Sequence, residues 1–239
     1  MFKFESKVRF SEVEEDGNLG LKGIINYFQD TSELQSEELG CGHDDNSEEN
    51  YFWVLNSWQI QIHKRPHLGD TIYAGTAPHS FKGIEGARNF FILDENQEVV
   101  VNANSIWSLM DVEKMRPMRI PEIFLTRYKT DEAYPMEYAP RKIDIRSLTE
   151  ECWSEVLSFT VEPYMLDMNH HMNNAQYVVV ASGHLPEDFS YNQLRAEYRK
   201  SAVVNDKLLV SNALIEGTLY QKITDAEGNI YTVLEYTTI

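Results

Sequence analysis

The densest group of side chains that could do chemistry lies at residues 167–177, which read DMNHHMNNAQY. Asp167, Asn169 and His171 place a carboxylate, an amide and an imidazole within one short segment. An imidazole can accept a proton from water near neutral pH. An amide can hold a carbonyl group or a water molecule without changing charge, and a carboxylate is a fixed acceptor for its neighbours. This pattern favours hydrolysis with a histidine as the base.

The cluster is expected at a helix N-terminus, because the next segment, NNAQYVVVAS, favours a helix. Free N–H groups and the helix macrodipole stabilise negative charge there, which suits hydrolysis through an oxyanion. Asn and Asp are also typical of turns and helix N-caps, so a purely structural turn explains the same composition. Both interpretations stay open at this level.

The elements that would position the cluster can be predicted from periodicity. Residues 3–13 alternate as a strand does, and residues 21–28 carry apolar side chains at i, i+3, i+4 and i+7, which predicts a helix that Gly40 would end. The later half of this helix is more polar. Its face either meets solvent beyond the core or lines a partly polar cavity.

Further strands are predicted downstream of that helix. The segment 41–50, CGHDDNSEEN, is acidic and polar and favours a loop. Alternating segments between turn residues predict strands at 52–64, 71–76, 87–93 and 98–110. One helix followed by antiparallel strands is typical of an α+β layer.

The second half of the sequence repeats the first. The segment LRAEYRKSAVVNDKLLVSNAL matches SWQIQIHKRPHLGDTIYAGTA, ITDAEGNIYTVLEYTT matches ILDENQEVVVNANSIWS, and residues 159–161 take the place of residues 8–10. Prolines are frequent between the halves. We therefore predict an N-terminal repeat at 1–125, a linker at 126–152 and a C-terminal repeat at 153–239, each a long helix wrapped by a curled antiparallel sheet.

Composition restricts the function classes. The net charge of −17 argues against nucleic acid and anionic membranes as partners. No apolar run approaches the ~20 residues that span a bilayer, and the N-terminus has no signal-peptide pattern, so a cytoplasmic location is expected. Cys41 and Cys152 form no CxxC pair, and neither a metal nor another cofactor is predicted.

The cluster and its surroundings resemble a known family. DMNHHMNNAQY is similar to the D-x-N-x-H-[VM]-N-N-x-x-Y signature of acyl-acyl-carrier-protein thioesterases of plant plastids and bacteria. SWQIQIHKRPHLGDTI, ANSIWSLMDVEKMRPMRIPEIF and EYRKSAVVNDKL resemble other segments of the same family, so nearly the whole chain is covered. The resemblance implies a double hotdog, with two helix-plus-sheet repeats in one chain, in agreement with the duplication.

The resemblance also implies an activity. The enzyme would release fatty acids from acyl carrier protein and so terminate fatty acid synthesis, with Asp167, Asn169 and His171 in its site. We take His171 as the base, helped by the other two residues.

The sequence departs from the family pattern at one point. Ser201 stands where the family has a catalytic glutamate, and Ala202 where plant members have a cysteine. Glu197 lies on the same strand, but at ~3.3 Å per residue it would be roughly 13 Å from Ser201, too far for direct substitution. Ser201 is therefore expected to act as a minor ligand of water.

By the same resemblance the acyl chain lies in the first repeat, between helix and sheet. The predicted lining side chains are of types that more often form plain core, and they do not define a chain length: Leu21, Ile25, Phe28, Ser32, Trp53, Leu55 and Trp58. The implied partner, acyl carrier protein, is acidic and needs local positive charge. Arg195, Arg199 and Lys200 are the predicted docking residues, although a solvated strand face explains them equally. A homodimer is left open.

Two other functions compete with this one. A coenzyme A thioesterase on the same fold would need a nucleotide site, and the sequence has no Gly-rich phosphate loop. A non-catalytic acyl-binding protein is favoured by the departure at Ser201 and opposed by the intact Asp167, Asn169 and His171.

Overall fold

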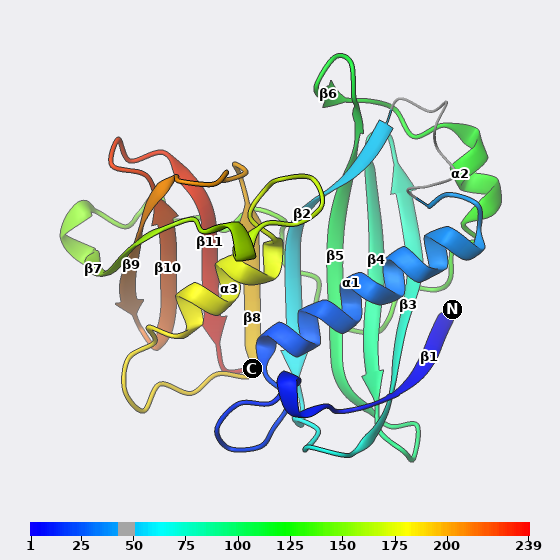
Figure 1. The fold of residues 1–239 in the computed structure, drawn as a ribbon, viewed down its shortest axis with the longest axis horizontal. Helices are drawn as coiled ribbons and strands as arrows, with labels where there is room; N and C mark the ends of the chain where they lie inside the picture. Colours follow the sequence, from blue (N-terminus) through cyan, green and yellow to red (C-terminus); the bar gives the residue numbers. More distant parts are fainter. Residues whose placement is uncertain (43–50) are drawn as a thin grey trace. The chain divides into compact units, whose positions relative to one another are not determined.

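The computed structural model describes residues 1–42 and 51–239, which form two compact units (Figure 1). The first unit comprises Met1–Asn56 and Ile60–Ala139, and the second comprises Ser57–Gln59 and Pro140–Ile239. The segment 126–152, predicted as a linker, is thus divided between the units. Most of the loop predicted at 41–50 lies outside the described residues.

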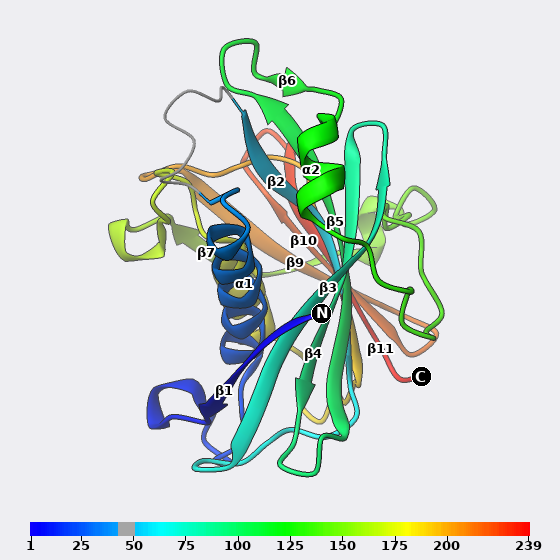
Figure 2. The same ribbon diagram turned by 90° about the vertical axis from the view of Figure 1, so that its right-hand side faces the viewer.

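The first unit is a sheet with one long helix across its face (Figure 2). Its strands run in the order β1-β3-β4-β5-β2, with β6 paired to β5. Their bounds are β1 Phe2–Lys7, β2 Tyr51–Ile62, β3 Thr71–Lys82, β4 Glu85–Leu93, β5 Val99–Asp111 and β6 Arg116–Pro117. The helices are η1 Phe10–Glu12, α1 Leu21–Glu38 and α2 Glu122–Arg127.

Helix α1 begins and ends as its sequence predicts. Its apolar stripe is buried, with Ile24, Ile25 and Phe28 each 0% exposed. Beyond its last turn Gly40 takes a φ of 62°, and its N–H donates to the Glu37 carbonyl at 3.0 Å. A left-handed residue after the last turn is the usual way to end a helix, and glycine adopts it without strain.

The second unit repeats this plan with a shorter helix. Its strands run β8-β11-β10-β9-β7, and its only α-helix among the described residues, α3, spans Asn174–Ser182. The strands are β7 Ser154–Thr160, β8 Gln193–Tyr198, β9 Lys207–Ile215, β10 Thr218–Thr224 and β11 Ile230–Thr237, and two 3₁₀ turns are η3 Glu150–Cys152 and η4 Pro163–Met165. The prediction of a long second helix is wrong: α3 has nine residues against 18 in α1. Gly183 and Pro186 follow its end, and proline does not continue a helix.

Two predicted strands have different bounds in the structure. β1 ends at Lys7, because the Glu12 carboxylate accepts a hydrogen bond from the Arg9 N–H at 2.8 Å and caps a 3₁₀ turn. β3 runs on to Lys82, past Pro78. β1 pairs with β3 only as far as Thr76, so Pro78 lies where β3 is paired with β4 alone. A bulge follows Pro78, and a sheet tolerates proline at such an unpaired edge or bulge.

Hydrogen bonds show the duplication directly. Val8 donates to the carbonyl of Asp70 and accepts from the N–H of Gly69, at 3.0 and 2.9 Å. Val161 does the same with Asp206 and Asn205, at 2.9 Å each. Val161 is therefore the counterpart of Val8, and the predicted match of residues 159–161 with 8–10 is wrong by two positions.

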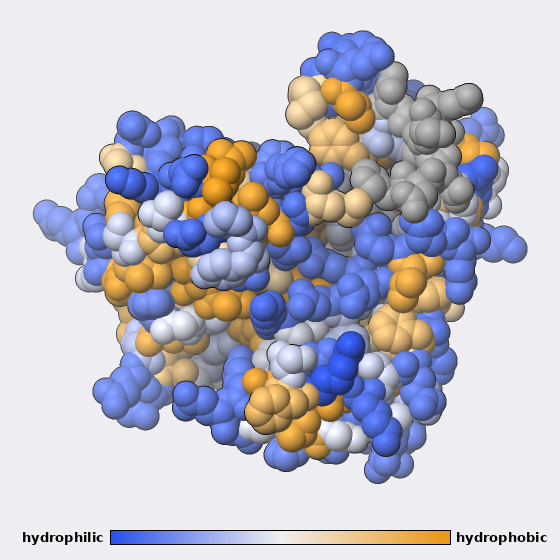
Figure 3. All heavy atoms as spheres, in the orientation of Figure 1, coloured by the Kyte–Doolittle hydropathy of each residue, from blue (hydrophilic) through white to orange (hydrophobic). Residues whose placement is uncertain are grey.

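The hydrophilic character of the surface (Figure 3) agrees with the high net negative charge of the chain. The face in Figure 3 is mostly hydrophilic, with dispersed hydrophobic patches. Within the described ranges, no helix has the length and apolar character needed to cross a bilayer.

The hairpin between β9 and β10 gives a first prediction. Glu216 and Gly217 turn the chain with φ of 48° and 84°, and a Cβ at Gly217 would meet nothing within 4 Å. Gly217→Ala should therefore cost only backbone strain, about 1–2 kcal/mol of unfolding free energy. Gly183→Ala is the control, because Gly183 has a helical φ of −67°. Urea unfolding should show a lower midpoint for the first variant alone, and equal midpoints would contradict this reading of the turn.

Candidate active site

Residues 167–171 form a closed loop directly before α3. A β-bridge joins Leu166 to Met172 across the base of this loop. Inside it, the Asp167 N–H donates to the His171 carbonyl at 2.8 Å, and the His170 N–H donates to the Asp167 carbonyl at 3.1 Å. The loop is thus fixed by its own backbone.

The Asp167 carboxylate completes the loop. Its Oδ1 accepts the backbone N–H of Asn169 at 2.8 Å and that of His171 at 3.3 Å. Asp167 is half-buried, whereas the side chains of Asn169 and His171 are exposed. Asp167 therefore shapes the loop, while the amide and the imidazole remain accessible to a ligand.

The helix N-terminus lies where the sequence predicts it. Asn173 is the N-cap of α3, and its side chain accepts the Ala175 N–H at 2.8 Å. The two interpretations of the cluster thus apply to different residues. Asp167 and Asn173 have the turn and cap roles, and Asn169 and His171 are the groups left for chemistry.

Ser201 lies beside this loop. The Met172 N–H donates to the Ala202 carbonyl at 2.8 Å, and the Ala202 N–H donates to the Tyr177 hydroxyl at 2.8 Å. Burial raises the pKa of the Tyr177 hydroxyl, so it stays neutral. Ala202 is fully buried and Ser201 is exposed. The structure therefore brings Ser201 to the segment that carries His171.

The first unit contains a counterpart of the same loop. There a bridge joins Val13 to Leu19, and the Leu19 N–H donates to the Pro66 carbonyl at 2.8 Å. The Glu14 N–H donates to the Asn18 carbonyl at 2.9 Å. Each bond has its equivalent in the loop of the second unit.

This counterpart shows what position 201 faces. By the matching bonds, Glu14 corresponds to Asp167 and Arg65 corresponds to Ser201. In the first unit these two side chains form an ion pair, with Arg65 Nη1 at 3.1 Å from Glu14 Oε2. A side chain at position 201 therefore has the direction needed to reach the loop of Asp167.

Glu197 is used in another way. It is 5% exposed, and its Oε2 accepts the Ile143 N–H at 2.9 Å and the Arg199 Nη2 at 2.8 Å. A carboxylate held by two donors inside the unit is a structural group. It does not replace the glutamate that is missing at Ser201.

The predicted docking residues differ in accessibility. Arg195 is largely buried, in an ion pair with Glu235 at 2.7 Å, and its Nη2 donates to the Pro140 carbonyl. Arg199 is exposed but pairs with Glu197. Lys200 is exposed, with its Nζ 3.5 Å from Asp225 and 4.3 Å from the centre of the Tyr231 ring. Lys200 is thus the one of the three that is most available to a partner.

A pocket in the first unit lies between the later half of α1 and the sheet. The empty space between its lining atoms is about 430 Å³, part of which is open to solvent. Its lining comes from α1, four strands and the residue after α2: Ser32, Glu33, Ser36, Trp53, Pro78, Phe81, Gly86, Ala87, Arg88, Trp107 and Tyr128. The partly polar lining of α1 agrees with the second of the two interpretations of that helix.

Two of the seven predicted lining residues, Ser32 and Trp53, line this pocket. The other five are buried core side chains outside its lining, each at most 3% exposed: Leu21, Ile25, Phe28, Leu55 and Trp58. The substrate role of all seven stays a prediction.

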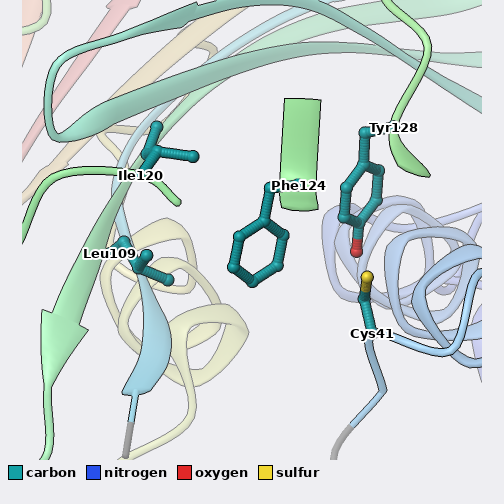
Figure 4. Close-up of a cluster of buried hydrophobic side chains, with 5 residues drawn as sticks. All are labelled: Cys41, Leu109, Ile120, Phe124 and Tyr128. Carbon is teal, nitrogen blue, oxygen red and sulfur yellow. The ribbon is translucent and has the colours of Figure 1, made fainter. Parts of the chain in front are cut away.

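Most of the pocket was not predicted from sequence. Tyr128 belongs to a segment predicted as linker, but it is 3% exposed and packs in a core cluster with Cys41, Leu109, Ile120 and Phe124 (Figure 4). The sequence alone could have indicated Arg88, because it is the one basic residue in the apolar strand segment GARNFFIL.

The fold defines the class of protein. Two helix-covered sheets in one chain are the double hotdog. The same fold is found in an acyl-ACP thioesterase from Bacteroides thetaiotaomicron, with a TM-score of 0.89 and 17% identity over 99% of this chain and 96% of that one. The 12:0-ACP thioesterase from Umbellularia californica has a TM-score of 0.82 and 18% identity over 99% and 96% of the two chains.

The family follows from the sequence models. Residues 1–128 match the acyl-ACP thioesterase N-terminal domain, and residues 149–230 match the acyl-ACP thioesterase C-terminal domain. The chain therefore belongs to the acyl-ACP thioesterase family, and the resemblance noted in the sequence is confirmed.

Curated relatives agree with this assignment. A chloroplastic acyl-[acyl-carrier-protein] hydrolase of Cuphea viscosissima is 26% identical over 223 residues, which are 83% of this chain and 51% of the relative. A chloroplastic oleoyl-acyl carrier protein thioesterase of Coriandrum sativum is 23% identical and covers 98% of this chain and 69% of its own length. The chain spans about half the length of the first of these relatives.

The role of Asp167 gives a second prediction. Asp167→Ala removes the acceptor of two backbone N–H groups, whereas Asp167→Asn keeps an oxygen at that position. Hydrogen exchange at the amides of Asn169 and His171 should accelerate roughly tenfold or more in the alanine variant and much less in the asparagine variant. Met168→Ala, at the exposed neighbouring position, is the control. Unchanged exchange in Asp167→Ala would show that the loop does not need the carboxylate.

Proposed function

We propose that the chain hydrolyses the thioester of acyl-acyl carrier protein and releases the free fatty acid, the reaction that ends fatty acid synthesis. One observation carries this proposal. His171 and Asn169 are both exposed shortly before α3, on a loop fixed by Asp167, in a chain that matches both domain models of the family. Binding alone would not require this arrangement.

In the proposed reaction His171 accepts a proton from water as the water oxygen attacks the thioester carbonyl. The Asn169 side-chain amide and the macrodipole of α3 stabilise the negative charge on the carbonyl oxygen. The C–S bond then breaks, and the proton on His171 passes to the leaving thiolate. Ser201, beside the loop, helps to hold the water. The products are the fatty acid and the free thiol of the carrier.

The pocket of the first unit is the proposed place of the acyl chain. Its aromatic walls, which include Trp53, Phe81 and Trp107, suit an apolar chain. The partner is proposed to be acyl carrier protein and not coenzyme A, because both matching models are those of acyl-ACP thioesterases.

The base is tested by His171→Ala. Loss of a general base should lower kcat by about 10²–10⁴-fold with little change in KM. The assay measures free fatty acid released from acyl carrier protein loaded with chains of several lengths. Retention of most of the wild-type rate would remove His171 from the mechanism. Binding without release by the wild-type protein, for every chain, would favour the non-catalytic alternative.

The control for this variant lies next to it in the sequence. His170 is exposed and has a φ of 60°. Asparagine tolerates that conformation, so His170→Asn changes the imidazole without straining the loop. It should keep a near wild-type rate.

Docking is tested at Lys200. Lys200→Gln removes a charge without placing a carboxylate against Asp225, and it leaves the Glu197–Arg199 pair intact. The KM for acyl-acyl carrier protein should rise roughly two- to fivefold at low salt, while the KM for an acyl-N-acetylcysteamine thioester stays constant. Lys22→Gln, at an exposed lysine on α1, is the control. Equal changes for both substrates would contradict docking at this residue.

A further inference from the structure

One buried charge in the pocket of the first unit is not explained by the proposed hydrolysis. Arg88 lines the pocket and is 9% exposed. It lies two residues before Phe90, whose ring is 5.2 Å from that of Phe28 on α1, so Arg88 is on the helix-facing side of β4. A chain of methylene groups alone gains nothing from a guanidinium there.

The surroundings of Arg88 satisfy it only in part. Its guanidinium carbon lies 5.4 Å from the centre of the Tyr128 ring and 6.0 Å from that of Phe90. Burial lowers the pKa of Arg88, and the nearby Tyr128 and Glu33 oppose this shift. Arginine nonetheless stays protonated in proteins. Aromatic faces stabilise its charge but accept no strong hydrogen bond, and the Tyr128 hydroxyl is a further polar group that favours the charged guanidinium.

One nitrogen of the guanidinium has no acceptor. Among residues 1–42 and 51–239, Nη1 of Arg88 is buried without a hydrogen-bond partner. A buried charged donor left in this state is costly, and native structures satisfy nearly all such groups. An acceptor supplied by a bound ligand would remove the cost.

Four other polar side chains of the pocket already donate hydrogen bonds within the protein. The hydroxyls of Ser32 and Ser36 donate to helix carbonyls at 2.8 and 2.7 Å. The Tyr128 hydroxyl donates to Ser36 at 2.7 Å, and Trp107 Nε1 donates to Ser105 at 2.6 Å. Arg88, by contrast, lines the pocket with a buried Nη1 that has no acceptor among the described residues.

The charge balance indicates which kind of acceptor fits. Glu33 also lines the pocket, and its carboxylate acts electrostatically on Arg88. A second carboxylate, from a dicarboxylic chain, would be repelled by Glu33. A neutral oxygen accepts from Arg88 without that repulsion, and a hydroxyl can also donate to an anionic neighbour.

We propose that this pocket selects acyl chains that carry a neutral oxygen, a hydroxyl or keto group, which accepts a hydrogen bond from the guanidinium of Arg88. The proposal rests on the proposed function, because it names the substrate class of the same site. It assigns Arg88 to substrate specificity, with no part in the chemical step.

The test measures binding separately from hydrolysis. The probes are N-methyl amides of medium- and long-chain fatty acids, either unsubstituted or carrying a hydroxyl, a keto group or a carboxylate at the far end of the chain. An amide replaces the thioester and is not turned over. Trp53 and Trp107 line the pocket, so tryptophan fluorescence reports occupancy.

The wild-type protein should bind hydroxy or keto amides about tenfold more tightly than the unsubstituted amide of equal length. Arg88→Met should abolish or reverse this ratio. Glu33→Gln, at an exposed position, is expected to fold and should improve binding of the carboxylate probe relative to the hydroxyl probe. The wild-type and Glu33→Gln comparisons decide the matter even if Arg88→Met is unstable.

Three results would overturn the proposal. In the first, the wild type binds the unsubstituted amide as tightly as the hydroxy or keto amides. In the second, the wild type prefers the carboxylate probe. In the third, a folded Arg88→Met keeps the wild-type ratio of affinities for the oxygenated and unsubstituted amides. Failure of the proposed function looks different. In that case no thioester is hydrolysed, while the preference among amides remains.

Discussion

In each unit one backbone hydrogen bond joins the start of the helix to the segment that follows a strand, and the candidate site depends on it. It runs from Leu19 to Pro66 in the first unit and from Met172 to Ala202 in the second, at 2.8 Å in both. Leu19, Met172 and Ala202 are at most 2% exposed, so a broken bond would leave buried polar groups unpaired. The bond fixes the loop before the helix, and with it the direction of every side chain on that loop.

The two units use this one scaffold differently. In the first unit the loop is closed on itself by side chains: Asp16 accepts from the Asn18 N–H at 2.9 Å, and Glu14 pairs with Arg65. In the second unit Ser201 stands in place of the arginine, so no charge neutralises Asp167 from that side. The carboxylate binds backbone N–H groups instead, and the imidazole of His171 is left accessible. Small changes at equivalent positions thus separate a structural loop from a candidate catalytic one.

Much of this could be predicted from the sequence, because the strongest signals are local. The stripe of α1, its end at Gly40, the duplication and the cluster before α3 each depend on a short segment with a clear pattern. The pocket could not be predicted in the same way. Its lining combines α1, four strands and Tyr128, and which side chains leave a space open depends on packing between distant segments. Apolar residues such as Ile25 and Trp58 fit a core and a pocket equally well by type, and the structure places them in the core.

The size of side chains explains why the first unit has the pocket. The later half of α1 presents Ser32 and Ser36 to the sheet, opposite Gly86 on β4. A Cβ at Gly86 would lie 3.1 Å from the Phe81 ring and 3.3 Å from that of Trp53, so the glycine keeps this wall open. In the second unit the shorter α3 packs Ala and Val against its sheet, and Gln221 donates to the Ala181 carbonyl at 2.9 Å. There Ala175, Val178 and Ala181 of α3 are buried, whereas Asn169 and His171 on the loop before α3 stay exposed. A duplication can therefore give two different surroundings at equivalent helices without a change of fold, because the size and polarity of a few side chains at each helix differ.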